Sequence, residues 1–370
     1  MSLDRAEALD DPTRVFIGAP VARVRGSVSW SFPMAPQDSK LPSIGGETIA
    51  FLHRFDAVAG DVELALTDRG RLRAASFLDG REPFWQERSV VPLDLSHRPV
   101  SPARLAVFHV GFCGSTLLAR LLDRPGRVLV LKEPQCLADI AAQRTQIERG
   151  NAIAPLPVLL DHALAHLGGA GEPDITVVLK PTNWVNSLIP ALCVPGRIDH
   201  AVFVSMDPRA YLGAVFRGGR ERIGFCARLA AEIAPVLPWG NEALAEAAGG
   251  GGDALDRAAC IVALLHLMQE TIFDGAIKAN GWSAKSRIDF AHLTQHPAGV
   301  LRRVRTQLGL PQPMDDEVSV ATQLERHAKD PASPFRPDRR LDEDAEVERH
   351  HAGRFDRALE WLESRWPPVN

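Results

Sequence analysis

The sequence predicts an α/β protein with a central, mostly parallel sheet flanked by helices, and two observations predict this class. From residue 102 onward, short apolar runs typical of buried strands alternate with longer stretches that have the spacing of amphipathic helices. The first apolar run leads through a glycine-containing turn directly into a helical pattern, over residues 105–122. Strands that alternate with helices are joined by crossover connections, which bring neighbouring strands together in parallel.

Residues 1–101 have a different texture and are expected to form a partly β accessory region ahead of a larger domain at 102–370. Short apolar runs separated by Gly, Pro and Asp predict strands at 15–24, 27–32, 62–66 and 90–95. A helix is expected at 47–58. The accessory region either covers the substrate side of the larger domain or only packs against it.

The larger domain carries the alternating pattern. Its strands are expected at 105–110, 127–131, 175–179, 200–205 and 287–290. Helices are expected from residue 115 and at 136–149, 155–167, 211–216 and 254–277, with a closing helix at 344–366. Four consecutive glycines predict a flexible loop over 245–253.

Composition excludes several classes of partner. With 370 residues and 45% hydrophobic content, the chain can bury one large core plus an appendage. The formal net charge of −4 provides no basic field for nucleic acid. The five cysteines include no C-x-x-C pair, so we expect free thiols and no zinc site. The start resembles no signal peptide and no run reaches about 18 apolar residues, so we expect a cytoplasmic protein without membrane contact.

Charged residues follow three of the expected strands. Lys132 and Glu133 follow the second strand, Lys180 ends the third, and Arg209 lies shortly after the fourth. Carboxyl ends of parallel strands meet at one edge of a sheet, where ligands of such folds bind. We therefore expect these side chains to converge on one crevice, although any one of them alone is more typical of a solvated loop.

The turn after the first strand has the features of an anion site. Gly111 and Gly114 allow positive φ angles and a close approach of the backbone to a ligand. The helix is expected to begin at Gly114 or Ser115, which directs free N–H groups and the positive end of the helix dipole at a phosphate or sulfate. A strand–turn–helix without a ligand has the same pattern. No Lys follows the second Gly, so the phosphate loop of ordinary ATPases and GTPases is not matched.

Four segments in the same order resemble the P-loop-like sulfotransferases, particularly their broad bacterial group. They are VGFCGSTLLARLLD at 110–123, LKPTNW at 179–184, HAVFVSMDPRAYLGAVF at 200–216 and RIDFAHLTQHPAGVLRRVRTQLGLP at 287–311. The resemblance spans residues 102–370 and leaves the accessory region unexplained. It implies a P-loop nucleotide-binding, sulfotransferase-like fold.

The resemblance also implies an activity. The family transfers a sulfuryl group from 3′-phosphoadenosine 5′-phosphosulfate to a hydroxyl or amine, here of a small acceptor, and needs no metal. By position, the donor-binding set is Gly111, Phe112, Cys113, Gly114, Ser115, Thr116 and Arg209. Within it, the N–H groups of residues 113–115 and the hydroxyls of residues 115 and 116 would cradle the phosphosulfate. Glu133 is the expected catalytic base, and His109, inside a strand, is a second candidate with an alternative structural role.

Three positions depart from the family pattern. Phe112 occupies the place of a cation in the loop, Met206 that of the 3′-phosphate Arg, and Ala214 that of a Ser. Each charge-assisted contact of this kind is worth roughly 1.5–3 kcal/mol. Nearby cations that could compensate are Arg209, Arg217, Arg220 and Arg222, and later Arg336, Arg339 and Arg340. Two alternatives therefore stay open: an ATP-binding, kinase-like protein of the same fold, and a non-catalytic nucleotide- or anion-binding module.

Overall fold

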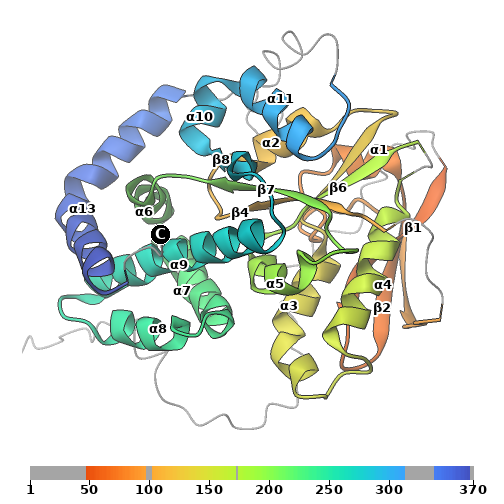
Figure 1. Cartoon of the computed structure of the whole chain (residues 1–370), viewed down its shortest axis with the longest axis horizontal. Helices are drawn as coiled ribbons and strands as arrows, with labels where there is room; N and C mark the ends of the chain where they lie inside the picture. Colours follow the sequence, from red (N-terminus) through yellow and green to blue (C-terminus); the bar gives the residue numbers. More distant parts are fainter. Residues whose placement is uncertain (1–46, 97–101, 172–173, 313–336, 367–370) are drawn as a thin grey trace, which may run out of the picture.

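The structure is a computed structural model that describes residues 47–96, 102–171, 174–312 and 337–366. Within these ranges the chain forms a three-stranded antiparallel sheet followed by a five-stranded parallel sheet with helices on its two faces (Figure 1). The α/β class expected from the alternation of strands and helices is confirmed.

The parallel sheet has the order β5-β6-β4-β7-β8. Its strands are β4 (Leu105–His109), β5 (Val128–Lys132), β6 (Thr176–Lys180), β7 (His200–Ser205) and β8 (Arg287–Asp289). The central strands are almost entirely buried, which explains why they read as continuous apolar runs rather than as alternating ones.

The strand order places a topological switch point beside β4. After β4 the chain moves to β5 at one side of the sheet, whereas after β7 it moves to β8 at the other side. The connections therefore diverge between β4 and β7, and ligands of open α/β sheets bind where this happens, at the carboxyl ends of the strands. His109 and Val204 are paired there, and the N–H of Val110 donates to the carbonyl of Val204 at 3.1 Å.

Helices enclose the sheet. Those described are α2 (Ser115–Leu122), α3 (Gln135–Glu148), α4 (Leu156–Gly168), α5 (Ile189–Leu192), α6 (Pro208–Arg217), α7 (Gly219–Ile233), α8 (Gly240–Gly249), α9 (Ala254–Ala279), α10 (Phe290–Gln295), α11 (Pro297–Gln307) and α13 (Pro337–Arg365), with 3-10 turns η1 (Asn183–Leu188), η2 (Ala234–Val236) and η3 (Ala284–Ser286). Helices α2 and α11 lie on one face, and α3, α5 and α9 on the other (Figure 1). The closing helix expected at 344–366 is confirmed as α13, which packs along α6 and α9.

The antiparallel sheet contains β1 (Thr48–Asp56), β2 (Asp61–Asp68) and β3 (Glu87–Pro92), with α1 (Arg69–Ala74) after β2. The helix expected at 47–58 is wrong, because β1 pairs with β2 along its whole length. This long-range ladder, with buried Phe51 and Phe55, outweighs the local helical pattern. The strand at 62–66 is confirmed as part of β2, whereas the one expected at 90–95 overlaps β3 only over 90–92, because β3 begins at Glu87 and ends at Pro92. The strands expected at 15–24 and 27–32 lie outside the described residues.

The glycine-rich segment is more helical than its composition predicts. The flexible loop expected at 245–253 is wrong in its first half, because α8 continues to Gly249. Ala243 and Ala247 are buried and α8 packs against α9, which offsets the low helix propensity of glycine. Asp253 then caps α9 through a capping box with Asp256.

The two sheets are joined by a buried carboxylate. Asp139 of α3 accepts hydrogen bonds from the Arg54 side chain at 2.8 Å and from the Phe55 backbone at 3.0 Å, both in β1. The accessory sheet is thereby held against the larger domain at a defined position.

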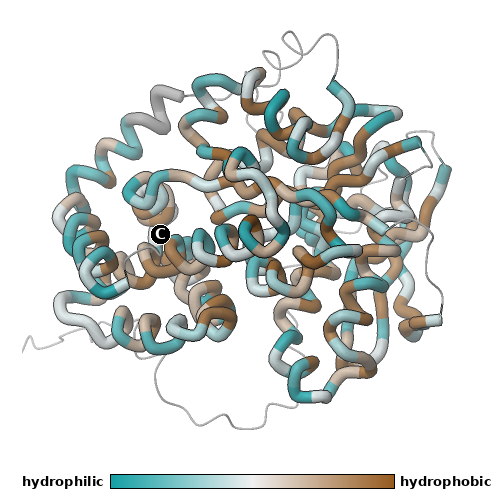
Figure 2. Tube along the Cα trace, in the orientation of Figure 1, coloured by the Kyte–Doolittle hydropathy of each residue, from teal (hydrophilic) through white to brown (hydrophobic). Residues whose placement is uncertain are grey.

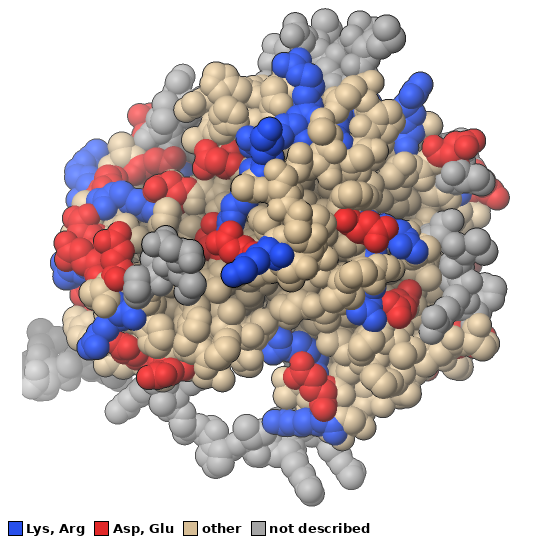
Figure 3. Space-filling view, in the orientation of Figure 1, with Lys and Arg blue, Asp and Glu red and all other residues tan. Residues whose placement is uncertain are grey.

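Helix α9 forms much of the interior. Among the described helices, it alone is long and apolar enough to cross a membrane, and most of its apolar part is buried inside the protein. Apolar residues concentrate in the central strands and the inner helices, while hydrophilic residues are frequent on α13 (Figure 2). Acidic and basic side chains intermix over α13 on the face shown in Figure 3.

Candidate functional site

The turn between β4 and α2 has an unusual backbone. Gly111, Phe112 and Gly114 have φ angles of 93°, 56° and 72°. Within the described residues, Phe112 and Glu133 are the two non-glycine residues with positive φ. Glu133 directly follows β5, and Phe112 lies shortly after the end of β4. Such conformations cost about 1–3 kcal/mol and persist where the surroundings enforce them, often at functional sites.

Both glycines of the turn are required by their surroundings. A Cβ at Gly111 would lie 2.9 Å from Nδ2 of Asn183, and a Cβ at Gly114 would lie 2.8 Å from the ring of Phe290. Helix α2 begins directly after Gly114, and no side chain caps its first turn. The side chains of Ser115 and Thr116 are buried at this helix start.

Cys113 turns its side chain inward, below the turn. Its Sγ lies 3.4 Å from the carbonyl oxygen of Val204. Burial raises the pKa of this thiol to about 11, and the charge of Lys180 together with the backbone N–H groups of Ser115 and Gly111 only partly opposes the effect. Cys113 is therefore a protonated packing residue, and the Ser115 N–H faces its sulfur.

His109 fastens the start of the turn. Its Nδ1 accepts from the N–H of Gly111 at 3.0 Å, which leaves the proton on Nε2, 3.0 Å from the carbonyl oxygen of Pro181. The imidazole therefore bridges the ends of β4 and β6, which is the structural role considered for it as an alternative.

Three buried amides complete this support and were missed from the sequence. Asn183 donates to the carbonyl of Val110 at 3.2 Å, and Asn186 donates to that of His109 at 3.0 Å. Gln269 of α9 accepts from Asn186 at 2.8 Å and reaches Val110 at 3.4 Å. The two asparagines, three residues apart in η1, could have indicated from the sequence that buried amides support the turn. Nothing in the sequence near Gln269 indicates its role.

Glu133 and Lys180 meet as expected. The buried Nζ of Lys180 contacts Oε1 of Glu133, and the N–H of Glu133 donates to the Lys180 carbonyl at 2.7 Å. The second carboxylate oxygen accepts from Arg81 at 3.2 Å. Arg81 belongs to the accessory region, and its guanidinium lies 4.1 Å from the ring centroid of Phe77. The accessory region thus contributes a cation to the candidate site.

Lys132 lies beside Lys180 in the sheet register but serves a different purpose. Its Nζ donates to the carbonyl of Arg73 at 2.7 Å, and its own carbonyl accepts from the N–H of Leu78 at 2.7 Å. Burial, reinforced by nearby arginines, lowers the pKa of Lys132 to about 8. Lys132 therefore holds the accessory region over the end of β5.

Arg209 is placed differently from the expectation. Its guanidinium bonds to Glu348 and Asp356 of α13, at distances of 2.5 to 3.0 Å. No contact within the described residues joins it to the turn. The reason is distant in sequence: α13 brings a row of acidic side chains against α6, and Arg217 is likewise paired with Asp344.

Arg222 is the expected compensating cation that reaches the turn. The Cζ of Arg222 lies 4.6 Å from the ring centroid of Phe112. Arg220 on the same helix is exposed. Arg336 and the side chains of Arg339 and Arg340 lie outside the described part of the chain.

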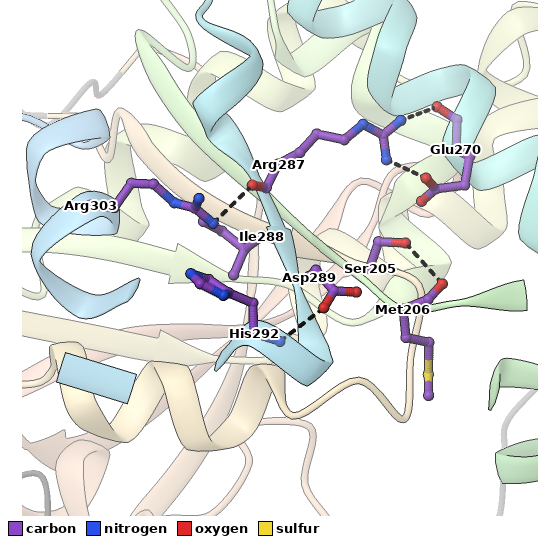
Figure 4. Close-up of a pocket in the computed structure, with 8 residues that line it drawn as sticks. All are labelled: Ser205, Met206, Glu270, Arg287, Ile288, Asp289, His292 and Arg303. Carbon is purple, nitrogen blue, oxygen red and sulfur yellow. Dashed lines mark hydrogen bonds and ion pairs between the residues drawn. The ribbon is translucent and has the colours of Figure 1, made fainter. Parts of the chain in front are cut away.

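A cavity of about 460 Å³ opens at the carboxyl ends of β7 and β8 (Figure 4). It is lined by Ser205, Met206, Glu270, Arg287, Ile288, Asp289, His292 and Arg303. Phe290 directly follows this lining and packs on Gly114, so the cavity is a neighbour of the turn. The lining mixes charges of both signs, with Arg287 paired to Glu270.

A scan against models of protein families finds no match for this chain, and no curated protein matches it. Within the described ranges, no group of three or more His, Cys, Asp or Glu side chains is arranged to hold a metal ion.

Proposed function

We propose that this protein binds the 5′-phosphosulfate of 3′-phosphoadenosine 5′-phosphosulfate in the 111–116 turn and transfers the sulfuryl group to a hydroxyl or amine of a small acceptor. In this proposal the larger domain is a P-loop-type, sulfotransferase-like fold located in the cytoplasm. The observation that carries the proposal is the turn itself. Three of its residues, Gly111, Phe112 and Gly114, have positive φ angles, and they precede a helix without a side-chain cap at the point where the strand connections diverge.

The neighbouring groups suit this chemistry. The first turn of α2 carries the buried side chains of Ser115 and Thr116 at the positive end of the helix dipole, and both would stabilise negative charge developing on the sulfuryl oxygens. In the transfer, the sulfur–oxygen bond to the nucleotide breaks and a bond to the acceptor forms. The acceptor proton passes to Glu133, and adenosine 3′,5′-bisphosphate leaves. The cavity beside Phe290 provides room for the remainder of the donor.

A second candidate, a non-catalytic anion- or nucleotide-binding module, is favoured by one observation. Both charged residues that the sequence suggested for the site already have protein partners. The expected base, Glu133, pairs with Lys180 and Arg81. The expected donor-binding residue, Arg209, pairs with acidic residues of α13. In such a module the turn would bind its anion without a free base beside it.

Thermal unfolding with added ligands tests the proposal. Adenosine 3′,5′-bisphosphate should raise the midpoint more than ATP with magnesium or inorganic sulfate, because only a ligand that prefers the folded state stabilises it. A larger rise with ATP and magnesium would support the kinase-like alternative. Bisphosphate binding without sulfuryl transfer to any member of a broad hydroxyl and amine panel would support the non-catalytic module.

A further inference from the structure

We infer that Arg222, held over the ring of Phe112, is an anion-binding residue of the 111–116 turn and supplies the positive charge that the turn's own sequence lacks. The inference rests on one part of the proposed function, the anion site in the 111–116 turn. It does not depend on which nucleotide binds or on the reaction. Its ligand is the phosphoryl or sulfuryl group that occupies the turn.

The side chain of Phe112 lies beside the turn and beneath Arg222. Its ring lies 6.3 Å from Tyr211 and 6.5 Å from Phe225, centroid to centroid, and under the guanidinium of Arg222. The side chain therefore packs against the α6–α7 wall next to the turn. A guanidinium over an aromatic face is held there by a cation–π interaction, so Phe112 acts as a platform for Arg222.

Among the described residues, Arg222 is a cation without a carboxylate partner. Its Nη1 donates to the carbonyl oxygen of Ala214, and no carboxylate of the described residues lies within ion-pair distance of it. Arg209 and Arg217 on the preceding helix are both paired with acidic residues of α13. Burial, together with the nearby Arg217, lowers the pKa of Arg222. A half-buried cation without a carboxylate is stabilised by an anionic ligand.

A purely structural role is the competing explanation. Ala214 lies in the last turn of α6, where carbonyl groups lack helical partners, and Arg222 could serve only to bond this carbonyl. The two roles differ in one measurable respect, because a structural role affects unfolding and leaves anion affinity unchanged.

The test is the affinity of the full chain for inorganic pyrophosphate, measured by calorimetry alongside the unfolding midpoint. Arg222→Met should weaken pyrophosphate binding by about tenfold or more, as expected for loss of a charge-assisted contact. Arg222→Lys should restore most of the affinity. Arg220→Met, two residues earlier and exposed on α7, is the matched control and should leave affinity unchanged.

Phe112→Leu adds a second readout. It should weaken pyrophosphate binding in the wild-type background but add little in the Arg222→Met background, because Phe112 acts through Arg222. Unchanged affinity in both Arg222 variants, or absent pyrophosphate binding by the wild-type chain, would overturn the inference. Affinity that depends on Arg222 while ATP outcompetes adenosine 3′,5′-bisphosphate would overturn the proposed sulfotransferase function and leave this inference intact.

Discussion

Glu133 and Lys180 form a contact between the carboxyl ends of β5 and β6, in which a fully buried ammonium group lies against a carboxylate whose backbone has a φ of 58°. Arg81 reaches the same carboxylate from the accessory region. The contact brings together a residue with positive φ, a buried charge and an arginine from the segment between α1 and β3.

Glu133→Gln should spare nucleotide binding and abolish sulfuryl transfer, because the amide cannot take the acceptor proton. It should also lower the free energy of unfolding by about 1–3 kcal/mol, since Lys180 loses its charged partner. Urea unfolding, calorimetric titration with adenosine 3′,5′-bisphosphate and a sulfuryl-transfer assay measure the three effects. Retained turnover in Glu133→Gln would remove Glu133 from its role.

Gly114→Ala should damage the turn more than Gly126→Ala, although both glycines have a φ of 72°. A left-handed alanine costs about 1–2 kcal/mol at either position. At Gly114 the added Cβ meets the ring of Phe290, whereas nothing lies within 4 Å of a Cβ at Gly126. Gly114→Ala should therefore lower both stability and bisphosphate affinity, and Gly126→Ala stability alone. Equal affinities in the two variants would contradict the assignment of the turn.

Lys132 predicts a specific pH dependence of stability. Its pKa is about 8 in the folded protein against an ordinary value of 10.5, so the folded state disfavours the charged form. The penalty is present below pH 8 and is relieved as the pH rises from about 8 to 10.5, where the unfolded chain still binds the proton. Unfolding free energies at pH 7.5 and 9.5 should show a gain that Lys132→Met loses and that the exposed-site control Lys278→Met keeps. A gain of the same size in Lys132→Met would refute this.

Arg209→Met should leave bisphosphate affinity unchanged, because the guanidinium is engaged by Glu348 and Asp356 of α13. These partners are partly exposed, so the loss of stability should be less than about 1 kcal/mol and should shrink in high salt. Titrations and unfolding at low and high sodium chloride provide the measurement. A tenfold loss of affinity would instead return Arg209 to the donor site.

Local patterns predicted the fold well and the site in part. The strand, turn and helix at 105–122 were predictable because apolar runs and glycines act over a few residues. β1 was missed because its ladder with β2 decides its conformation. Arg81 and Gln269 were missed for a related reason: their contacts with Glu133 and Val110 span 52 and 159 residues of sequence. The same holds for Arg209, whose acidic partners lie in the last helix.

The most direct test of the central claim is a calorimetric titration of adenosine 3′,5′-bisphosphate into the wild-type chain and into Ser115→Ala. We expect one saturable site, competition by inorganic pyrophosphate, and affinity about tenfold weaker in the variant, because Ser115→Ala removes the hydroxyl at the first position of α2 that would bond the anion. No binding heat, or identical affinity in the two proteins, would contradict the assignment of the 111–116 turn as the nucleotide site.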